Sequence, residues 1–156
     1  DKNIIDYIRY NIRSQIFAKS LPMPMVLGNL KRLELLRSQP HLKNKLWENA
    51  RKLQNGLKEK GFDIGKTDSV VTPVYMTGGV EEATAMVMDL RENYTIFCSI
   101  VLYPVIPKGH IIYRLIPTAV HTDGDIQLTL KAFEETKKKL DAGEYKVEAI
   151  PDMAEI

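Results

Sequence analysis

The stretch that most constrains the fold is residues 103–126, YPVIPKGHIIYRLIPTAVHTDGDI. Pro104 and Pro107 hold the residues before them in extended conformations, because a residue that precedes proline is disfavoured from the helical region. Gly109 then permits a turn. Residues 111–116 are rich in β-branched side chains and predict a strand. The stretch therefore predicts a rigid loop, a turn and a strand in succession.

Arg114 stands in this predicted strand between two isoleucines. Because side chains alternate along a strand, Ile112, Arg114 and Ile116 share one face. A guanidinium in such a row either forms an ion pair within the protein, reaches water, or binds an anionic ligand. The pattern alone favours a structural or solvated arginine. A carboxylate or phosphate site stays open, because the planar guanidinium binds those anions in a bidentate manner.

Composition is that of a globular domain with one core: 156 residues, 44% hydrophobic and 27% charged. A net charge of +2 with dispersed basic residues gives no indication of nucleic-acid binding. The single cysteine, Cys98, excludes an internal disulfide and is expected to be a buried, unreactive thiol. Neither a membrane span nor a signal peptide is apparent, so a cytoplasmic location is expected.

The first part of the chain is predicted to be helical. Apolar residues recur every three or four positions in residues 3–17, in a second helix ending near Ser38, and in a third from Leu42 to Gly61. The pattern then changes to a strand at residues 68–76, in which Pro73 indicates an edge position or a bulge.

The remaining elements are a helix from Val80, an apolar strand over residues 95–102 expected to be buried on both faces, the strand at 111–116, and a helix capped by Thr122. This β-α-β-β-α order after three helices predicts an α+β fold, with a small, mostly antiparallel sheet covered by helices and preceded by a long helical connection.

Other candidate sites are weak. His41, His110 and His121 lack metal-ligand spacing, and His121 is expected to belong to the strand-to-helix turn. The pair Gly78-Gly79 before a helix is more typical of a plain turn than of a phosphate site.

Two motifs resemble a known family. The segments YPVIPKG and RLIPTAVHTDGDI are similar to the C-terminal signature of the pyridoxal-phosphate-dependent α-oxoamine synthases of aminotransferase class I/II (fold type I), which include glycine C-acetyltransferase, 8-amino-7-oxononanoate synthase, 5-aminolevulinate synthase and serine palmitoyltransferase. Ile106 stands where that signature usually has valine. The matching positions are Arg114, Thr118, Ala119, His121 and Thr122.

Residues 13–22, RSQIFAKSLP, resemble a second segment of that family, R-P-x-x-F-S-x-S-L-P. In the family this segment crosses a dimer interface and touches the cofactor phosphate held in the other subunit. The resemblance thus implies a homodimer and a cofactor-binding role for Ala18, Lys19 and Ser20. Ala18 replaces the usual serine and has no hydroxyl, so backbone N–H groups or Lys19 would have to hold the phosphate.

The resemblance also implies a function for the whole protein: a pyridoxal 5'-phosphate (PLP) enzyme that condenses serine, glycine or alanine with an acyl-CoA, with loss of CO2, to give an aminoketone. Serine palmitoyltransferase and glycine C-acetyltransferase are the most similar types. Arg114 would bind the α-carboxylate of the amino acid. The family's Schiff-base lysine lies in a T-x-x-K motif that is absent from the start of this sequence. The cofactor is therefore expected to be held mostly by an upstream domain, with no catalytic residue in this chain, which alone should be inactive.

On the same basis, residues 1–60 are expected to be the helical end of a large domain with its connecting helices, residues 61–142 a small α/β domain, and residues 143–156 a tail. The alternative is a non-catalytic ligand-binding domain, or a pseudo-enzyme subunit that supports an active partner, in which Arg114 forms an internal ion pair.

Overall fold

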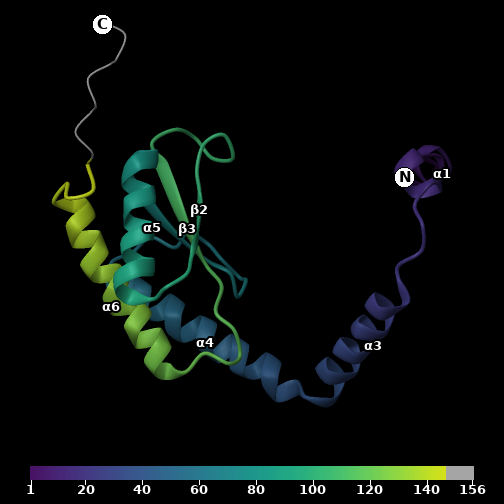
Figure 1. Ribbon diagram of the computed structural model, residues 1–156, viewed down its shortest axis with the longest axis horizontal. Coiled ribbons are helices and arrows are strands. Elements are labelled where there is room, and N and C mark those ends of the chain that lie inside the picture. Colours follow the sequence, from purple (N-terminus) through teal and green to yellow (C-terminus); the bar gives the residue numbers. More distant parts are fainter. Residues whose placement is uncertain (147–156) are drawn as a thin grey trace, which may run out of the picture. The chain divides into compact units, whose positions relative to one another are not determined.

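The computed structural model describes residues 1–146 and divides the chain into two compact units, residues 1–40 and the residues from 41 on (Figure 1). The domain boundaries expected from the sequence, at residues 60 and 142, refer to a whole protein and stay a prediction. The predicted tail lies mostly outside the described residues.

The first unit consists of three helices: α1 (Lys2–Asn11), α2 (Arg13–Ile16) and α3 (Met23–Ser38). The side chain of Asp1 caps α1 by accepting a hydrogen bond from the Asn3 amide at 2.9 Å. The single helix predicted over residues 3–17 is interrupted at Ile12, whose ψ of 112° is extended. None of the residues in these three helices is buried. Their apolar stripes therefore form no core of their own.

The second unit contains the sheet and its covering helices. Its strands pair antiparallel in the order β1-β3-β2, which confirms the predicted small antiparallel sheet and the β-α-β-β-α order. The elements are α4 (Pro40–Glu59), β1 (Thr72–Thr77), α5 (Val80–Tyr94), β2 (Ser99–Val101), β3 (His110–Leu115) and α6 (Asp123–Asp141).

One face of the sheet packs on α4, α5 and α6, which lie beside it in Figure 1. Tyr113 of β3 and Phe133 of α6 are fully buried at the centre, with ring centroids 6.0 Å apart in an edge-to-face arrangement. Phe62 meets Phe133 in the same manner at 6.1 Å. Such aromatic pairs add to the stabilisation that burial of their area provides.

Local signals account for the ends of several elements. Thr122 caps α6: its hydroxyl accepts from the Asp125 amide at 3.2 Å, and the Asp125 carboxylate accepts from the Thr122 amide at 2.7 Å, as the sequence predicts. The pKa of Asp125 is lowered by the hydrogen bonds that its carboxylate accepts from the Thr122 amide and, at 2.8 Å, from the Thr122 hydroxyl. Gly61 closes α4 with a φ of +79°, which favours glycine. Pro73 lies in β1, an edge strand, as expected.

The strand predicted over residues 95–102 is wrong in length and burial. Only Ser99–Val101 form β2, at the other edge of the sheet, and Phe97 is 85% exposed. α5 is longer than its apolar pattern and runs to Tyr94, and Thr95 follows it in a left-handed conformation. This αL residue turns the chain, so the apolar run after it cannot pair along its whole length.

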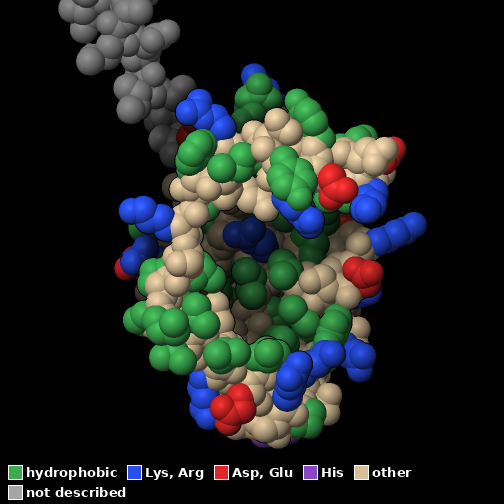
Figure 2. All heavy atoms as spheres, turned by 90° about the vertical axis from the view of Figure 1, so that its right-hand side faces the viewer, with side chains coloured by type: hydrophobic (Ala, Val, Ile, Leu, Met, Phe, Trp, Pro, Cys, Tyr) green, Lys and Arg blue, Asp and Glu red, His purple; other side chains and the backbone are tan. Residues whose placement is uncertain are grey.

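Hydrophobic side chains are also numerous at the surface, where they are interspersed with lysines and arginines (Figure 2). Within residues 1–146, no helix combines the length and the apolar composition needed to cross a membrane.

Candidate functional site

Arg114 lies on the face of the sheet opposite the helices. Its neighbours on β3, Tyr113 and Leu115, point into the core and are 0% and 5% exposed, whereas Arg114 itself is exposed. On one side its backbone pairs with Pro73, and on the other with Ser99. The middle strand of the sheet therefore holds this arginine with a strand on either side.

Within the described residues, the guanidinium of Arg114 forms a hydrogen bond at one of its nitrogens. Its Nε donates a hydrogen bond to Ser99 Oγ at 3.1 Å. Within residues 1–146, no Asp or Glu oxygen lies within 4.0 Å of the group, and its terminal nitrogens form no hydrogen bond. The internal ion pair considered as an alternative is thus not formed in the described part of the chain. The hydrogen bond at Nε orients the group, and its terminal nitrogens are unpaired within residues 1–146.

The segment that follows β3 is held from α4. Asn49 is fully buried, and its Nδ2 donates to the carbonyl oxygens of Thr118, at 2.9 Å, and His121, at 2.8 Å. The amide of Thr118 donates to His121 Nδ1 at 2.9 Å. Because Nδ1 accepts, a neutral His121 ring carries its proton on Nε2. His121 thus belongs to the strand-to-helix turn, as expected.

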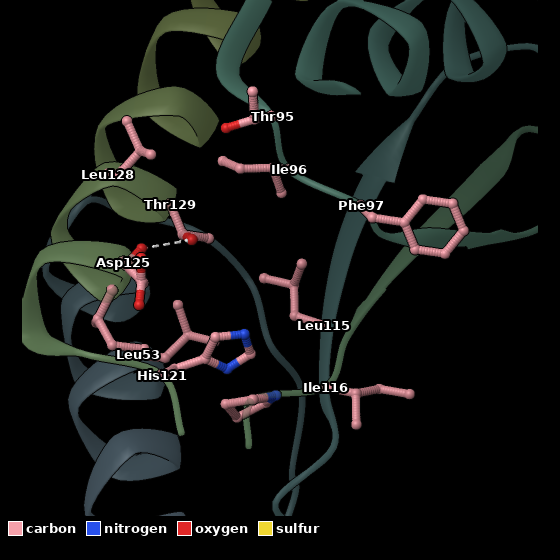
Figure 3. Close-up of a pocket in the computed structure, with 12 residues that line it drawn as sticks. Leu53, Thr95, Ile96, Phe97, Leu115, Ile116, His121, Asp125, Leu128 and Thr129 are labelled. Carbon is pink, nitrogen blue, oxygen red and sulfur yellow. Dashed lines mark hydrogen bonds between the residues drawn. The ribbon is translucent and has the colours of Figure 1, made fainter. Parts of the chain in front are cut away.

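A pocket of about 300 Å³ lies beside this segment (Figure 3). Its lining comes from α4, the α5–β2 connection, the end of β3 and the start of α6. In Figure 3, Leu115 and Ile116 lie on the β3 side of the pocket and His121 and Asp125 on the α6 side, while the ring of Phe97 points away from His121. The pocket is small and mixed in polarity.

A larger groove of about 750 Å³ borders the other end of the sheet. Ile112, two residues from Arg114 and on the same face of β3, lines it together with Tyr75 of β1. Ile106 and Pro107 of the proline-containing loop, and Leu140 of α6, add further apolar surface. Charged side chains, among them Lys137 and Asp141 of α6, also line the groove. A mostly apolar groove of this volume with a few polar groups is typical of small-molecule sites.

The predicted cofactor-binding residues, Ala18, Lys19 and Ser20, lie in the first unit, in the exposed connection between α2 and α3. The amide of Ala18 donates to Gln15 O at a long 3.4 Å. In the described part of the chain, Lys19 and Ser20 form no hydrogen bond. Their cofactor role stays a prediction.

Two residues of the site were missed in the sequence. Ser99 is the one polar side chain in the apolar run IFCSIVL, which was a usable signal for a hydrogen-bonding partner. Asn49 falls on the apolar stripe of α4, three residues after Leu46 and four before Leu53, and a polar residue there is expected to have a buried partner. What the sequence could not reveal is which distant groups they contact.

Two weaker candidates carry no site. The amide of Gly79 donates to Glu82 Oε2 at 2.6 Å, so a side chain of α5 already occupies the position considered for phosphate. Within residues 1–146, no group of three or more His, Cys, Asp or Glu side chains is arranged to hold a metal ion.

Comparison with known proteins shows which enzymes the chain is similar to. No family model matches the chain. A cysteate-C-fatty acyltransferase from Capnocytophaga ochracea is 58% identical over 143 residues, which cover 92% of this chain and 34% of that protein. An 8-amino-7-oxononanoate synthase from Thermoanaerobacter pseudethanolicus is 33% identical over 139 residues, 89% of this chain and 35% of that protein. A structure of serine palmitoyltransferase with PLP superimposes with a TM-score of 0.76 at 28% identity, covering 88% of this chain and 34% of that one.

The chain is similar to the C-terminal part of α-oxoamine synthases. It spans about a third of the length of the curated relatives that it matches and corresponds to their C-terminal part. The structural match also confirms the predicted fold, that of the C-terminal domain of fold-type I PLP enzymes. Enzymes of this kind are PLP-dependent acyltransferases, so the resemblance inferred from the two motifs is confirmed.

Proposed function

We propose that the protein containing this chain is a PLP-dependent C-acyltransferase, which condenses an amino acid with a fatty acyl-CoA and releases CoA and CO2. The 58% identity to a cysteate-C-fatty acyltransferase supports this reaction class and adds cysteate to serine, glycine and alanine as candidate amino acids. The observation that carries the proposal in the structure is Arg114, which lies on the open face of the sheet with its outer guanidinium edge unpaired within residues 1–146.

Arg114 fits the α-carboxylate of an amino acid. The guanidinium is permanently charged, and its planar edge forms two parallel hydrogen bonds to a carboxylate. Ser99 holds Nε, so the two terminal nitrogens are the ones that face a ligand. A substrate bound by two parallel hydrogen bonds has restricted rotation. Holding a reactant in one orientation lowers the activation barrier of such a reaction.

When bound, PLP supplies the electron sink that makes the bonds at the amino acid's Cα labile. The residues of this chain that we assign to it are Ala18, Lys19 and Ser20, through backbone N–H groups and the Lys19 ammonium, which suit a phosphate. As in the family, we expect these residues to act across a homodimer. The remaining contacts are expected from a part of the protein upstream of this chain.

The acyl group is expected to use the groove beside Ile112. This groove is mostly apolar and adjoins the face of β3 that carries Arg114. A long acyl chain has no polar group to satisfy, so apolar walls are sufficient to bind it. Because acyl-CoA is the expected second substrate, a cytoplasmic location remains part of the proposal.

The test is an absorbance titration of the full-length protein, loaded with PLP, against cysteate, serine, glycine and alanine. A saturable change in the cofactor band with one of these amino acids, followed by CO2 release when acyl-CoA is added, is the expected result. A protein that takes up no PLP would contradict the proposal and favour a non-catalytic or pseudo-enzyme subunit. A protein that takes up PLP but responds to none of the four would reject this substrate set.

A further inference from the structure

Asn49 is the feature of the second unit that the proposed function has not used. Its side chain is fully buried, yet only its nitrogen is satisfied: Nδ2 donates to the Thr118 and His121 carbonyls, while Oδ1 has no hydrogen-bond partner in the described structure. Both contacted groups are carbonyls, which only accept, so the NH2 end of the amide must face them. The orientation that leaves Oδ1 unpaired is therefore imposed by the segment and does not result from an exchange of O and N.

An unpaired buried amide oxygen destabilises a fold, and an apolar side chain of similar size would avoid that penalty. Another buried polar residue offers a contrast: Thr136 of α6 satisfies its own hydroxyl by donating to the Ala132 carbonyl at 2.8 Å within the same helix. Asn49 instead donates both of its hydrogen bonds to a segment about 70 residues away in sequence. Its contribution therefore lies in what it does for that segment.

The segment from Ile116 to His121 has few other anchors. The pairing of β3 ends with Arg114 opposite Ser99 and with Leu115 opposite Thr72. The next fixed element, α6, begins at its cap, Thr122. Between them, in the described structure, the backbone forms one hydrogen bond within the segment, from the Thr118 amide to His121 Nδ1, and the two to Asn49. The two bonds to Asn49 are the described hydrogen bonds that join the segment's backbone to α4, and Pro117 of the segment is buried as well.

We propose that Asn49 is a positioning residue for Arg114. By fixing the Thr118 and His121 carbonyls, it holds the chain just beyond Arg114, the penultimate residue of β3, and so keeps the strand end and the guanidinium in one orientation. Ser99 fixes the side chain at Nε. The neighbouring strands hold the backbone of Arg114 itself, and Asn49 fixes the chain that follows the strand. A bidentate carboxylate contact depends on direction, so a strand end free to rotate binds less well. This inference rests on the proposed function, in which Arg114 binds the amino acid.

The test uses the full-length protein with the variant Asn49→Leu, which keeps the branched shape and the number of heavy atoms, removes both donors and also removes the unpaired oxygen. The matched control is Thr136→Val, which removes a buried hydroxyl and its hydrogen bond far from the segment. We expect Asn49→Leu to weaken binding of the responsive amino acid about tenfold in the absorbance titration, and to raise KM more than it lowers kcat. Thr136→Val should leave the affinity within about twofold, whatever it does to thermal stability.

A double-mutant cycle separates positioning from general damage. If Asn49 acts through Arg114, adding Asn49→Leu to Arg114→Ala causes no further loss of amino-acid affinity. Equal losses in the presence and absence of Arg114 would overturn the inference. Should Asn49→Leu fail to accumulate, Asn49→Ser, which is smaller and retains one donor, is measured in the same cycle with a correspondingly smaller effect.

A reading independent of activity is amide hydrogen exchange of residues 115–122 in the protein without cofactor. Faster exchange there in Asn49→Leu, but not in Thr136→Val, is expected if Asn49 holds the segment. Unchanged exchange would overturn the inference even if the affinity fell. If the wild-type protein binds no amino acid, the proposed function fails. Faster exchange would then show that Asn49 holds the segment but would leave it no substrate to position, and the inference would fall with that function.

Discussion

The two faces of β3 carry alternating residues with opposite surroundings. Ile111, Tyr113 and Leu115 point into the core and are at most 5% exposed. His110 and Arg114 point the other way and are exposed, and Ile112 is half-buried. The same six-residue strand thus builds a core on one side and presents an exposed arginine, the proposed binding group, on the other. The core side fixes the position of the backbone, and this allows the open side to hold an arginine in a defined place.

This contrast predicts that substitutions on the two sides affect different measurements. A change on the core side should lower the free energy of unfolding, and ligand affinity should fall only as far as folding fails. A change on the open side should lower affinity and leave the free energy of unfolding nearly unchanged.

The largest effect is expected from Phe133→Ala, which removes the ring that meets both Tyr113 and Phe62. Truncation of a fully buried phenylalanine leaves a cavity and costs about 3–5 kcal/mol. Urea unfolding followed by circular dichroism measures the loss. The control is Phe97→Ala, at a phenylalanine that is 85% exposed, for which a change below about 0.5 kcal/mol is expected. Similar losses of unfolding free energy in the two variants would contradict the difference between the core and the exposed surface.

The next effect is expected from Arg114→Ala in the full-length protein. Loss of a charge-assisted carboxylate contact should weaken amino-acid binding about 100-fold, which corresponds to about 2.7 kcal/mol, while the urea midpoint stays close to that of the wild type. The cofactor band should still form. Arg114→Lys keeps the charge without the bidentate geometry, so its affinity for the amino acid should lie between those of the wild type and Arg114→Ala. An unchanged affinity in Arg114→Ala would remove this residue from the site.

Much of this arrangement follows from local sequence signals. Strand alternation predicted that the side chains of Arg114 and Tyr113 lie on opposite faces of the sheet. The helix cap at Thr122 and the edge position of Pro73 were predicted from the preferences of threonine and proline. The prediction of a buried strand over residues 95–102 was wrong. Hydrophobicity alone does not distinguish a buried strand from a segment at the edge of the sheet, where Phe97 is exposed. The contacts of Ser99 and Asn49 could not be predicted, since they join residues 15 and about 70 positions apart.

The smallest effect is expected from the thiol of Cys98, which lies on the core side next to the exposed Phe97. Burial raises the pKa of this thiol to about 11, above its ordinary value of about 8.5 in an unfolded chain. A raised pKa means that the folded state favours the protonated thiol, so its contribution to stability is complete below about pH 8.5 and is lost as the pH rises toward 11.

At pH 9.5 this loss should be on the order of 1 kcal/mol relative to neutral pH. The measurement is the free energy of unfolding in urea at pH 7.5 and 9.5 for the wild type and for Cys98→Ala. Other groups also titrate in this range, so the informative quantity is the difference between the two proteins, which should narrow as the pH rises. If the difference in the free energy of unfolding between the two proteins stays constant over this range, the Cys98 thiol is as accessible to water as the open side of the sheet. The difference in burial between Cys98 and its neighbour Phe97 would then not hold.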